Sequence, residues 1–281
     1  MIKVKNIVTM AWLAEHLHDP NVAVADCRFM LSKPDAGRAA YEEGHIPGAV
    51  YVDMERDMSG PAREHGGRHP LPDLGIFALR MGELGIDGDT TVVAYDDQGG
   101  PFAARLWWML TFLGHRRVHV LDGGFSAWKA AGYPVETEIV RREAKHFSPR
   151  VTTGMMIAVE ELRRKLGQPG VAIVDSREPS RYRGEHEPID RKAGHIPGAV
   201  NCFWKDGVDE DGKWRGAGEQ AARFRRIDPA AEVIVYCGSG ITACPNVLAL
   251  KEAGYENVRL YVGSWSDWVS YEENPVATGE E

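Results

Sequence analysis

The sequence predicts an α/β protein of two tandem domains, each a parallel sheet flanked by helices. Three observations favour this fold class. The length of 281 residues exceeds what one domain usually needs. Short apolar stretches alternate with helical stretches rich in Ala and Leu, which is typical of βα units around a parallel sheet. The motifs of the first half also recur in the same order about 140 to 150 residues later.

An internal repeat gives the clearest indication of how the chain is organised. Each half begins with a short apolar strand that ends in Asp-x-Arg. Each half then contains Gly-His-Ile-Pro-Gly-Ala and later closes on Gly-x-aromatic-Ser-x-Trp. The matching pairs are 22–28 with 171–177, 44–49 with 194–199, and 123–128 with 263–268. Several ordered matches of this kind do not arise by chance, so we interpret the two halves as a duplicated domain.

The domain boundaries follow from this repeat. We expect the first domain over 1–140 and the second over 150–281. The stretch from about 136 to 153 mixes charges and shows little periodicity, so it is expected to connect the domains. The Gly-His-Ile-Pro-Gly-Ala boxes are typical of turns that enter strands, and His45 and His195 are expected to be structural rather than catalytic.

The composition argues against several classes of function. A net charge of −8 disfavours nucleic acid or an acidic membrane surface as the main partner. No apolar stretch approaches the roughly 20 residues that a membrane-spanning helix needs, and the N-terminal segment is too short and interrupted for a signal peptide. The four cysteines have neither a disulfide-framework pattern nor zinc-ligand spacing, so no metal is expected. A reducing cytoplasm is the expected location, because a reactive thiol stays free there.

The loop after the apolar run 232–236 is the strongest candidate for chemistry. The run predicts a buried strand, and 243–253 predicts a helix rich in Ala and Leu. Backbone N–H groups that converge between such elements stabilise a sulfur anion, and glycine lets the loop curl tightly. We interpret this loop as a cradle for a nucleophilic thiol, although a buried structural cysteine is the alternative. Its residues are Cys237, Gly238, Ser239, Gly240, Ile241 and Thr242.

The same loop argues against a cysteine-dependent phosphatase. Such an enzyme needs Cys-x5-Arg, because the guanidinium grips the phosphate. The residue six past Cys237 is Ala243, so this grip is missing. Aligning the halves places Asp96 at the position of Cys237 and Gln98 at that of Ser239. The first domain therefore lacks the nucleophile, and the second is expected to carry the chemistry.

Together these motifs resemble the tandem rhodanese-type sulfurtransferases over nearly the whole chain. The loop is similar to the Cys-Gly-Ser-Gly-Val-Thr loop of the 3-mercaptopyruvate branch, whereas thiosulfate-using members usually carry charged residues after the cysteine. The resemblance implies an inactive first domain and transfer of sulfane sulfur from 3-mercaptopyruvate through a Cys237 persulfide. The implied acceptor is cyanide, a small thiol or thioredoxin, and no cofactor is needed. Thiosulfate as the donor and a non-catalytic persulfide relay module are the alternatives.

The resemblance also implies a proton relay. In the 3-mercaptopyruvate branch, a serine two residues past the cysteine acts with a histidine and an acidic residue from the first domain. The serine matches Ser239. The histidine matches His69, in the loop Gly-Arg-His-Pro-Leu-Pro, and the acidic residue would be near Glu55 or Asp57. A hydroxyl–imidazole–carboxylate chain suits delivery of a proton to an enolate.

Binding of the donor carboxylate is the last implied feature. The branch places two arginines before the second Gly-His-Ile-Pro-Gly box, and Arg181 matches the first. The second position is occupied by Asp190, which departs from the pattern. We expect Arg191, one residue later, or Arg183 to take its place. The alternative is that the donor carboxylate binds more weakly and that the substrate preference differs. The other implied substrate-binding residues are those of the loop, Gly238, Gly240, Ile241 and Thr242.

Overall fold

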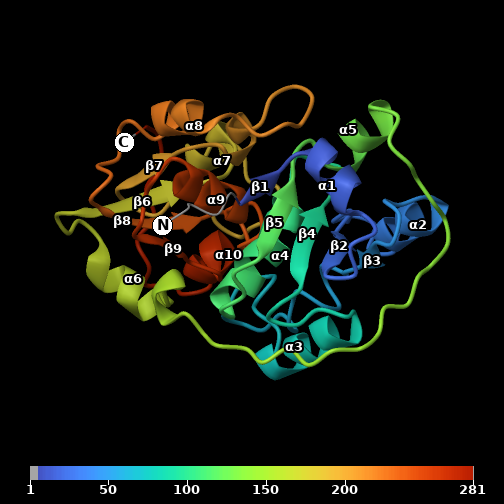
Figure 1. Cartoon of the computed structure of the whole chain (residues 1–281). Coiled ribbons are helices and arrows are strands. Elements are labelled where there is room, and N and C mark those ends of the chain that lie inside the picture. Colours follow the sequence, from blue (N-terminus) through green and yellow to red (C-terminus); the bar gives the residue numbers. More distant parts are fainter. Residues whose placement is uncertain (1–5, 281) are drawn as a thin grey trace. The chain divides into compact units, whose positions relative to one another are not determined.

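The computed structural model describes residues 6–280 and divides them into two compact units (Figure 1). Unit 1 consists of 6–60, 71–152 and 208–214, and unit 2 of 61–70, 153–207 and 215–280. Each unit therefore includes one short segment from the other half of the sequence. The sequence did not predict this exchange, and it matters for the site because 61–70 contains His69.

Unit 1 contains a parallel sheet with the strand order β1-β5-β4-β2-β3. All five residues of β2 are buried, as expected for a sheet covered on both faces. The strands are β1 (Ile7–Val8), β2 (Val22–Asp26), β3 (Val50–Tyr51), β4 (Thr91–Tyr95) and β5 (Val118–Leu121). The helices are α1 (Met10–His16), α2 (Ala36–Glu43), α3 (Leu74–Glu83), α4 (Pro101–Phe112) and α5 (Gly124–Ala130).

Unit 2 contains a second parallel sheet, with the order β7-β6-β8-β9. Its strands are β6 (Val171–Asp175), β7 (Ala199–Asn201), β8 (Glu232–Tyr236) and β9 (Val258–Leu260). Its helices are α6 (Val159–Lys165), α7 (Pro179–Tyr182), α8 (Ala217–Arg223), α9 (Cys244–Glu252) and α10 (Ser264–Trp268), with 3-10 turns η1 (Thr153–Met155) and η2 (Trp204–Gly207). The loop between β8 and α9 lies at the carboxyl ends of the strands, where α/β sheets place their binding sites.

The two sheets repeat one arrangement. Strands β3-β2-β4-β5 of unit 1 correspond to β7-β6-β8-β9 of unit 2, and β1 is an addition. The Asp-x-Arg motif forms the same buried ion pair twice, Asp26 with Arg28 and Asp175 with Arg177, at 2.6 Å in each unit. Each arginine also donates to the carbonyl of the glycine that opens the next box, at 2.7 and 2.6 Å. The predicted tandem α/β architecture is therefore confirmed.

The two boxed histidines are buried in equivalent places. His45 Nδ1 lies 2.7 Å from the carbonyl oxygen of Tyr41, and His195 Nδ1 lies 2.8 Å from that of Tyr182. Each imidazole also stacks on the same tyrosine ring, with centroids 4.1 and 3.8 Å apart. These contacts give both histidines the structural role that the sequence predicted.

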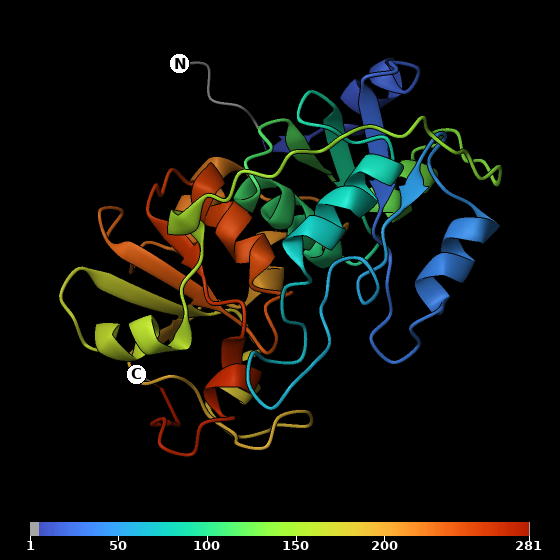
Figure 2. The ribbon, with the colours of Figure 1, turned by 90° about the horizontal axis from the view of Figure 1, so that it is seen from below.

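The connecting segment forms no helix or strand from 137 to 152, and Figure 2 shows it as the yellow-green trace that leads to α6. Backbone hydrogen bonds attach it to unit 1, from Lys145 N to the Gly82 carbonyl at 2.9 Å and from Arg150 N to the Leu113 carbonyl at 2.8 Å. A segment that mixes charges without periodicity cannot bury a continuous apolar face, so it runs extended along its unit.

The described residues contain four free cysteines, Cys27, Cys202, Cys237 and Cys244. Within 6–280 no helix is both long and apolar enough to cross a membrane. Over the same residues no group of three or more His, Cys, Asp or Glu side chains is arranged to hold a metal ion.

Candidate active site

Cys237 follows β8 directly and its side chain is buried, with 1% of its surface exposed. Its Sγ accepts a hydrogen bond from the Gly240 N–H at 3.2 Å. Gly240 has φ +81°, and a Cβ there would collide with the carbonyl oxygen of Val262. Only glycine therefore lets the loop turn back and present this N–H to the sulfur.

The start of α10 forms the other side of the cysteine cradle. Ser264 Oγ accepts a hydrogen bond from the Cys237 N–H at 3.1 Å and lies 4.0 Å from its Sγ. The Cys237 carbonyl in turn accepts from the Trp265 N–H at 2.9 Å. Ser264 is buried and adopts φ +56°, a conformation that costs free energy for any residue but glycine. At the matching position of unit 1, Gly124 has φ +60°.

Ser264 was not among the site residues that the sequence predicted. The available signal was the repeated Gly-x-aromatic-Ser-x-Trp stretch, whose second residue is a glycine in one half and Ser264 in the other. Ser264 has a strained backbone conformation at a position where the other half has glycine. This strain indicates that its hydroxyl is needed for its hydrogen bond to the cysteine loop.

Ser239 and His69 meet within unit 2. His69 Nδ1 lies 2.9 Å from Ser239 Oγ, and both side chains are buried, at 7% and 8% exposed. The segment 61–70 that carries His69 is attached to α10 by two hydrogen bonds. Gly66 N donates to Asp267 Oδ1 at 2.7 Å, and Arg68 N donates to Ser266 Oγ at 3.2 Å. The structure thus brings together the three residues predicted as catalytic, Cys237, Ser239 and His69.

Two guanidinium groups lie close to the cysteine loop at Gly238. A Cβ on Gly238 would lie 3.0 Å from Arg68 Nη2 and 3.6 Å from both terminal nitrogens of Arg181. Arg181 was predicted as a substrate-binding residue. Arg68 was not, because nothing local in the sequence indicates that it lies beside a loop 170 positions later. Its proximity to His69, which was predicted, was the only available signal.

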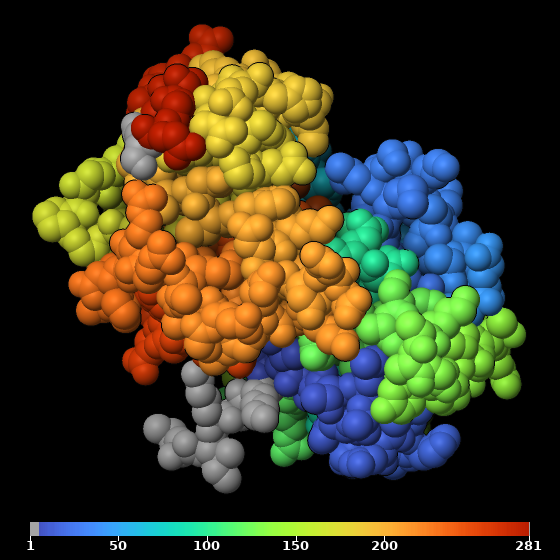
Figure 3. All heavy atoms as spheres, turned by 90° about the horizontal axis from the view of Figure 1, so that it is seen from above, coloured from blue at the N-terminus to red at the C-terminus, as the bar shows by residue number. Residues whose placement is uncertain are grey.

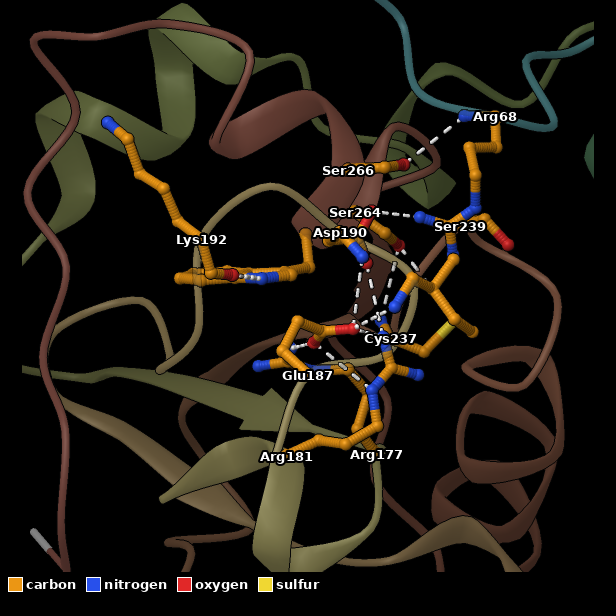
Figure 4. A network of polar contacts seen from close by, with 12 residues as sticks. Arg68, Arg177, Arg181, Glu187, Asp190, Lys192, Cys237, Ser239, Ser264 and Ser266 are labelled. Atoms are coloured by element: carbon orange, nitrogen blue, oxygen red, sulfur yellow. Dashed lines mark hydrogen bonds and ion pairs between the residues drawn. The ribbon is translucent and has the colours of Figure 1, made fainter. Parts of the chain in front are cut away.

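Asp190 joins the two arginines that face the loop (Figure 4). Its Oδ1 forms an ion pair with Arg68 and its Oδ2 accepts from Arg181 Nη2 at 3.1 Å. Burial raises the pKa of Asp190, with the Glu187 charge adding to the effect against the two arginines. Arg181 also donates two hydrogen bonds to the Glu187 carboxylate, of 3.1 and 2.7 Å. Although burial opposes it, these bonds and backbone N–H donors lower the pKa of Glu187.

The site therefore consists of the Cys237 loop, its hydrogen-bond donors and two arginines, within a duplicated α/β fold. Comparisons with known proteins identify the family that has this fold. The model of the rhodanese-like domain matches residues 9–131 and 158–271. The chain belongs to the rhodanese-like domain family. The predicted resemblance is confirmed, with one matched range in each half of the chain.

Similar full-length proteins carry sulfurtransferase names. The chain is 44% identical to a probable 3-mercaptopyruvate sulfurtransferase of Pseudomonas aeruginosa over 98% of both chains. It is 39% identical to a putative thiosulfate sulfurtransferase, SseB, of Mycobacterium tuberculosis over 97% of both. A solved structure of 3-mercaptopyruvate sulfurtransferase from Leishmania major matches with a TM-score of 0.82 and 31% identity, covering 93% of this chain and 73% of that one.

The two arginines expected to replace the missing one belong to the second rhodanese-like unit. Arg191 is exposed. Arg183 pairs with Glu185 at 2.8 Å and with Glu280 at 3.3 Å, and Figure 3 shows the red C-terminal residues against the yellow segment of this unit. The guanidinium that the structure places beside Arg181 is that of Arg68.

The remaining predicted residues lie where the loop enters α9. Ile241 is buried and Thr242 is half-buried. Of the expected acidic partners, Glu55 is exposed and Asp57 belongs to unit 1, where it accepts a hydrogen bond from Arg80 Nε at 3.1 Å.

The corresponding loop of the first rhodanese-like unit holds a carboxylate in place of the thiol. Asp96 Oδ1 accepts hydrogen bonds of 2.9 Å from the backbone N–H groups of Gln98 and Gly100. Its Oδ2 accepts from those of Phe102 and Ala103, at 2.9 and 3.1 Å. Burial raises the pKa of Asp96 to about 6 against these donors. The loops of both units therefore direct backbone N–H groups at the side chain that follows the strand, four at Asp96 and that of Gly240 at Cys237, and only the second loop contains a thiol there.

Proposed function

We propose that this protein is a sulfurtransferase that moves sulfane sulfur from 3-mercaptopyruvate through a persulfide on Cys237. The observation that carries the proposal is the placement of a buried thiol under an N–H donor, beside a serine–histidine pair and two arginines. The Gly240 N–H at 3.2 Å from Sγ is oriented to stabilise a sulfur anion. Relatives named as sulfurtransferases support the same activity.

The transfer has two steps. The Cys237 thiolate attacks the donor sulfur, an S–S bond forms, and the C–S bond of the donor breaks with its electron pair moving to carbon. The resulting enolate takes up the proton that the donor thiol gives up, which yields pyruvate, and Cys237 keeps the outer sulfur as a persulfide anion. A nucleophilic acceptor then removes that sulfur and regenerates the thiolate.

Ser239 and His69 move the proton between the donor thiol and the enolate. The hydroxyl stands two residues after the nucleophile, and its hydrogen bond to His69 Nδ1 at 2.9 Å connects it to an imidazole, a group that can accept and donate a proton. Proton transfer by positioned side chains of this kind typically contributes about a hundredfold or more to a rate.

Arg181 and Arg68 bind the donor carboxylate. Both guanidinium groups reach the space above Gly238, one residue from the nucleophile, and a guanidinium fork matches a carboxylate in shape and charge. In this proposal Arg68 fills the role that the sequence assigned to Arg191. The neutral loop residues Ile241 and Thr242 add no charge, which favours a monoanionic keto acid over dianionic thiosulfate.

The acceptor is proposed to be cyanide in the assay and a small thiol or thioredoxin in the cell. Each is a nucleophile that can attack the outer sulfur of a persulfide. We propose a reducing compartment such as the cytoplasm as the place of action, because Cys237 functions only as a free thiol and the cysteines of the described chain are free.

The decisive experiment measures cyanide-dependent thiocyanate formation with 3-mercaptopyruvate and with thiosulfate, side by side. Wild type should prefer 3-mercaptopyruvate, and Cys237→Ser should abolish the activity. Cys202→Ser is the matched control, because it removes a thiol at the end of β7, outside the cysteine cradle, and should retain activity. Mass spectrometry of the wild type after donor addition, without cyanide, should find one extra sulfur on Cys237.

Two outcomes would contradict the proposal. A preference for thiosulfate would mean that the arginine pair outweighs the neutral loop in selecting the donor. No turnover with either donor, together with uptake of sulfur from a persulfidated protein, would favour the relay module.

A further inference from the structure

The carboxylate of Asp190 occupies the place beside the two arginines where the donor carboxylate would bind. Its side chain is 4% exposed, and each of its oxygens engages one of the two arginines that face Gly238. Within the 3-mercaptopyruvate branch that the loop resembles, this position carries an arginine. The chain therefore provides one of its own carboxylates where the substrate would provide one.

The charges around the loop cancel in pairs. Arg68 is matched by Asp190, and Arg181 by Glu187, whose carboxylate it holds with two hydrogen bonds. The third guanidinium of the network, that of Arg177, is held by the buried Asp175 at 2.6 Å. Three guanidinium groups thus face three carboxylates, so these arginines present no net positive charge to an anionic donor.

We propose that Asp190 is a specificity residue that competes with the donor for Arg68 and Arg181 and selects against donors of higher negative charge. This inference rests on the proposed function, because it assumes that the donor carboxylate binds at these arginines. A donor with one charge exchanges its carboxylate for that of Asp190. A donor with two charges brings a second charge into a site that is already neutral, next to Asp190 and Glu187, and is repelled.

The inference predicts an effect that scales with donor charge. Asp190→Asn keeps the side-chain shape, removes one negative charge and frees the arginine pair. It should raise kcat/KM about fivefold for monoanionic 3-mercaptopyruvate and about 25-fold for dianionic thiosulfate, because each unit charge of the donor gains a similar factor. Asp190→Glu retains the competing charge and should stay close to wild type for both donors.

Glu185→Gln is the matched control. It removes the same charge five residues away, but Glu185 is exposed and pairs with Arg183 on the surface. Long-range attraction caused by a change in net charge would appear in both variants, whereas release of the arginine pair would appear only in Asp190→Asn. Adding salt screens the surface effect more strongly than the buried one.

A binding measurement separates this inference from the proposed function. Calorimetric titration of pyruvate and sulfate should show about fivefold and 25-fold tighter binding to Asp190→Asn than to wild type, without any sulfur transfer. Tighter binding in a protein with no turnover would uphold the inference and reject the sulfurtransferase proposal. Turnover with unchanged or equally changed KM for both donors would overturn the inference alone. If Asp190→Asn does not fold, Asp190→Ala should give the same dependence on charge.

Discussion

His69 and Ser239 form one of two similar histidine–serine pairs within the segment 61–70 and unit 2. The second pair is His65 Nδ1 with Ser270 Oγ, at 2.7 Å, and that imidazole also stacks on Tyr271. The pairs differ in burial, because His65 is exposed whereas His69 is 7% exposed. Water exchanges protons freely with an exposed pair, so only the buried one can deliver a proton selectively to a reacting group.

This difference predicts opposite results for two matched substitutions. His69→Ala should lower kcat for 3-mercaptopyruvate about a hundredfold with a smaller change in KM, because the relay acts on the chemical step. His65→Ala should change kcat less than about twofold, since a solvated pair on the surface contributes little. Steady-state thiocyanate formation measures both. Equal losses in the two variants would indicate that His69 only holds the segment in place.

The cysteines should differ in reactivity with pH. Burial raises the pKa of Cys202 to about 11 and that of Cys27 well above its ordinary value. Below its pKa a thiol reacts through its minor thiolate form, so alkylation of Cys202 should accelerate about tenfold per pH unit between about pH 7 and 9. Cys237, whose sulfur has an N–H donor, should be alkylated first at pH 7.5. Peptide mapping by mass spectrometry tests this order, and faster labelling of Cys202 would contradict it.

At the level of residues, the sequence predicted which side chains lie together where its signals were local. Cys237 and Ser239 lie in one loop between a strand and a helix, so the pattern alone placed them side by side. Arg68 escaped prediction because its partners, Asp190 and the loop at Gly238, are distant in sequence. Ion pairing leaves no periodic trace in a sequence, and only the fold shows which arginine meets which carboxylate.

Among the elements, the segment 61–70 decides whether the site is complete. It carries both Arg68 and His69 and has no helix or strand to hold it. Gly67 has φ +82°, and a Cβ there would collide with the carbonyl oxygen of Gly263, the N-cap residue of α10. Gly66 also has a positive φ, +101°, but a Cβ there would come no nearer than 3.9 Å to Pro70.

Substitutions of these two glycines distinguish the effect of backbone strain from the effect of losing the contact between the segment 61–70 and α10. Gly66→Ala and Gly67→Ala both force alanine into a left-handed conformation, at a cost of about 1–2 kcal/mol each. Only Gly67→Ala also drives a methyl group into the Gly263 carbonyl, so it should displace the segment. We expect kcat/KM to fall at least about tenfold more in Gly67→Ala. Limited proteolysis within 61–70 should accelerate in that variant alone, and equal effects of the two substitutions would reject the docking role.

Strands and helices were more predictable than the segments that join them. The predicted helix over 243–253 appears as α9 (Cys244–Glu252), and the predicted strand 232–236 is β8. Apolar runs and Ala/Leu-rich stretches determine such elements locally. The exchange of 61–70 and 208–214 between the units depends instead on long-range contacts of loops, for which composition gives no signal.

Over the whole molecule, the two units have equivalent loops that direct backbone N–H groups at one side chain. That side chain differs between the units. Cys237 in unit 2 corresponds to Asp96 in unit 1, and both lie in a turn whose N–H groups point inward. In unit 1 two of these donors, Phe102 and Ala103, belong to the first turn of α4, which is almost entirely buried. The carboxylate therefore caps a core helix, which gives this loop of unit 1 a structural role.

Replacing that carboxylate should destabilise the protein without affecting the chemistry. Asp96→Ala leaves four N–H donors without this acceptor, three of them buried, and we expect a loss of about 3 kcal/mol or more in the free energy of unfolding. Asp97→Ala, at the exposed neighbouring position, should cost about 0.5 kcal/mol or less. Urea unfolding should be measured at pH 8, where Asp96 of the wild type is ionised because its pKa is about 6. Thiocyanate formation by the folded fraction should be retained in both variants, since neither residue belongs to unit 2. A loss of kcat in Asp96→Ala with unchanged stability would instead give this carboxylate a part in the reaction.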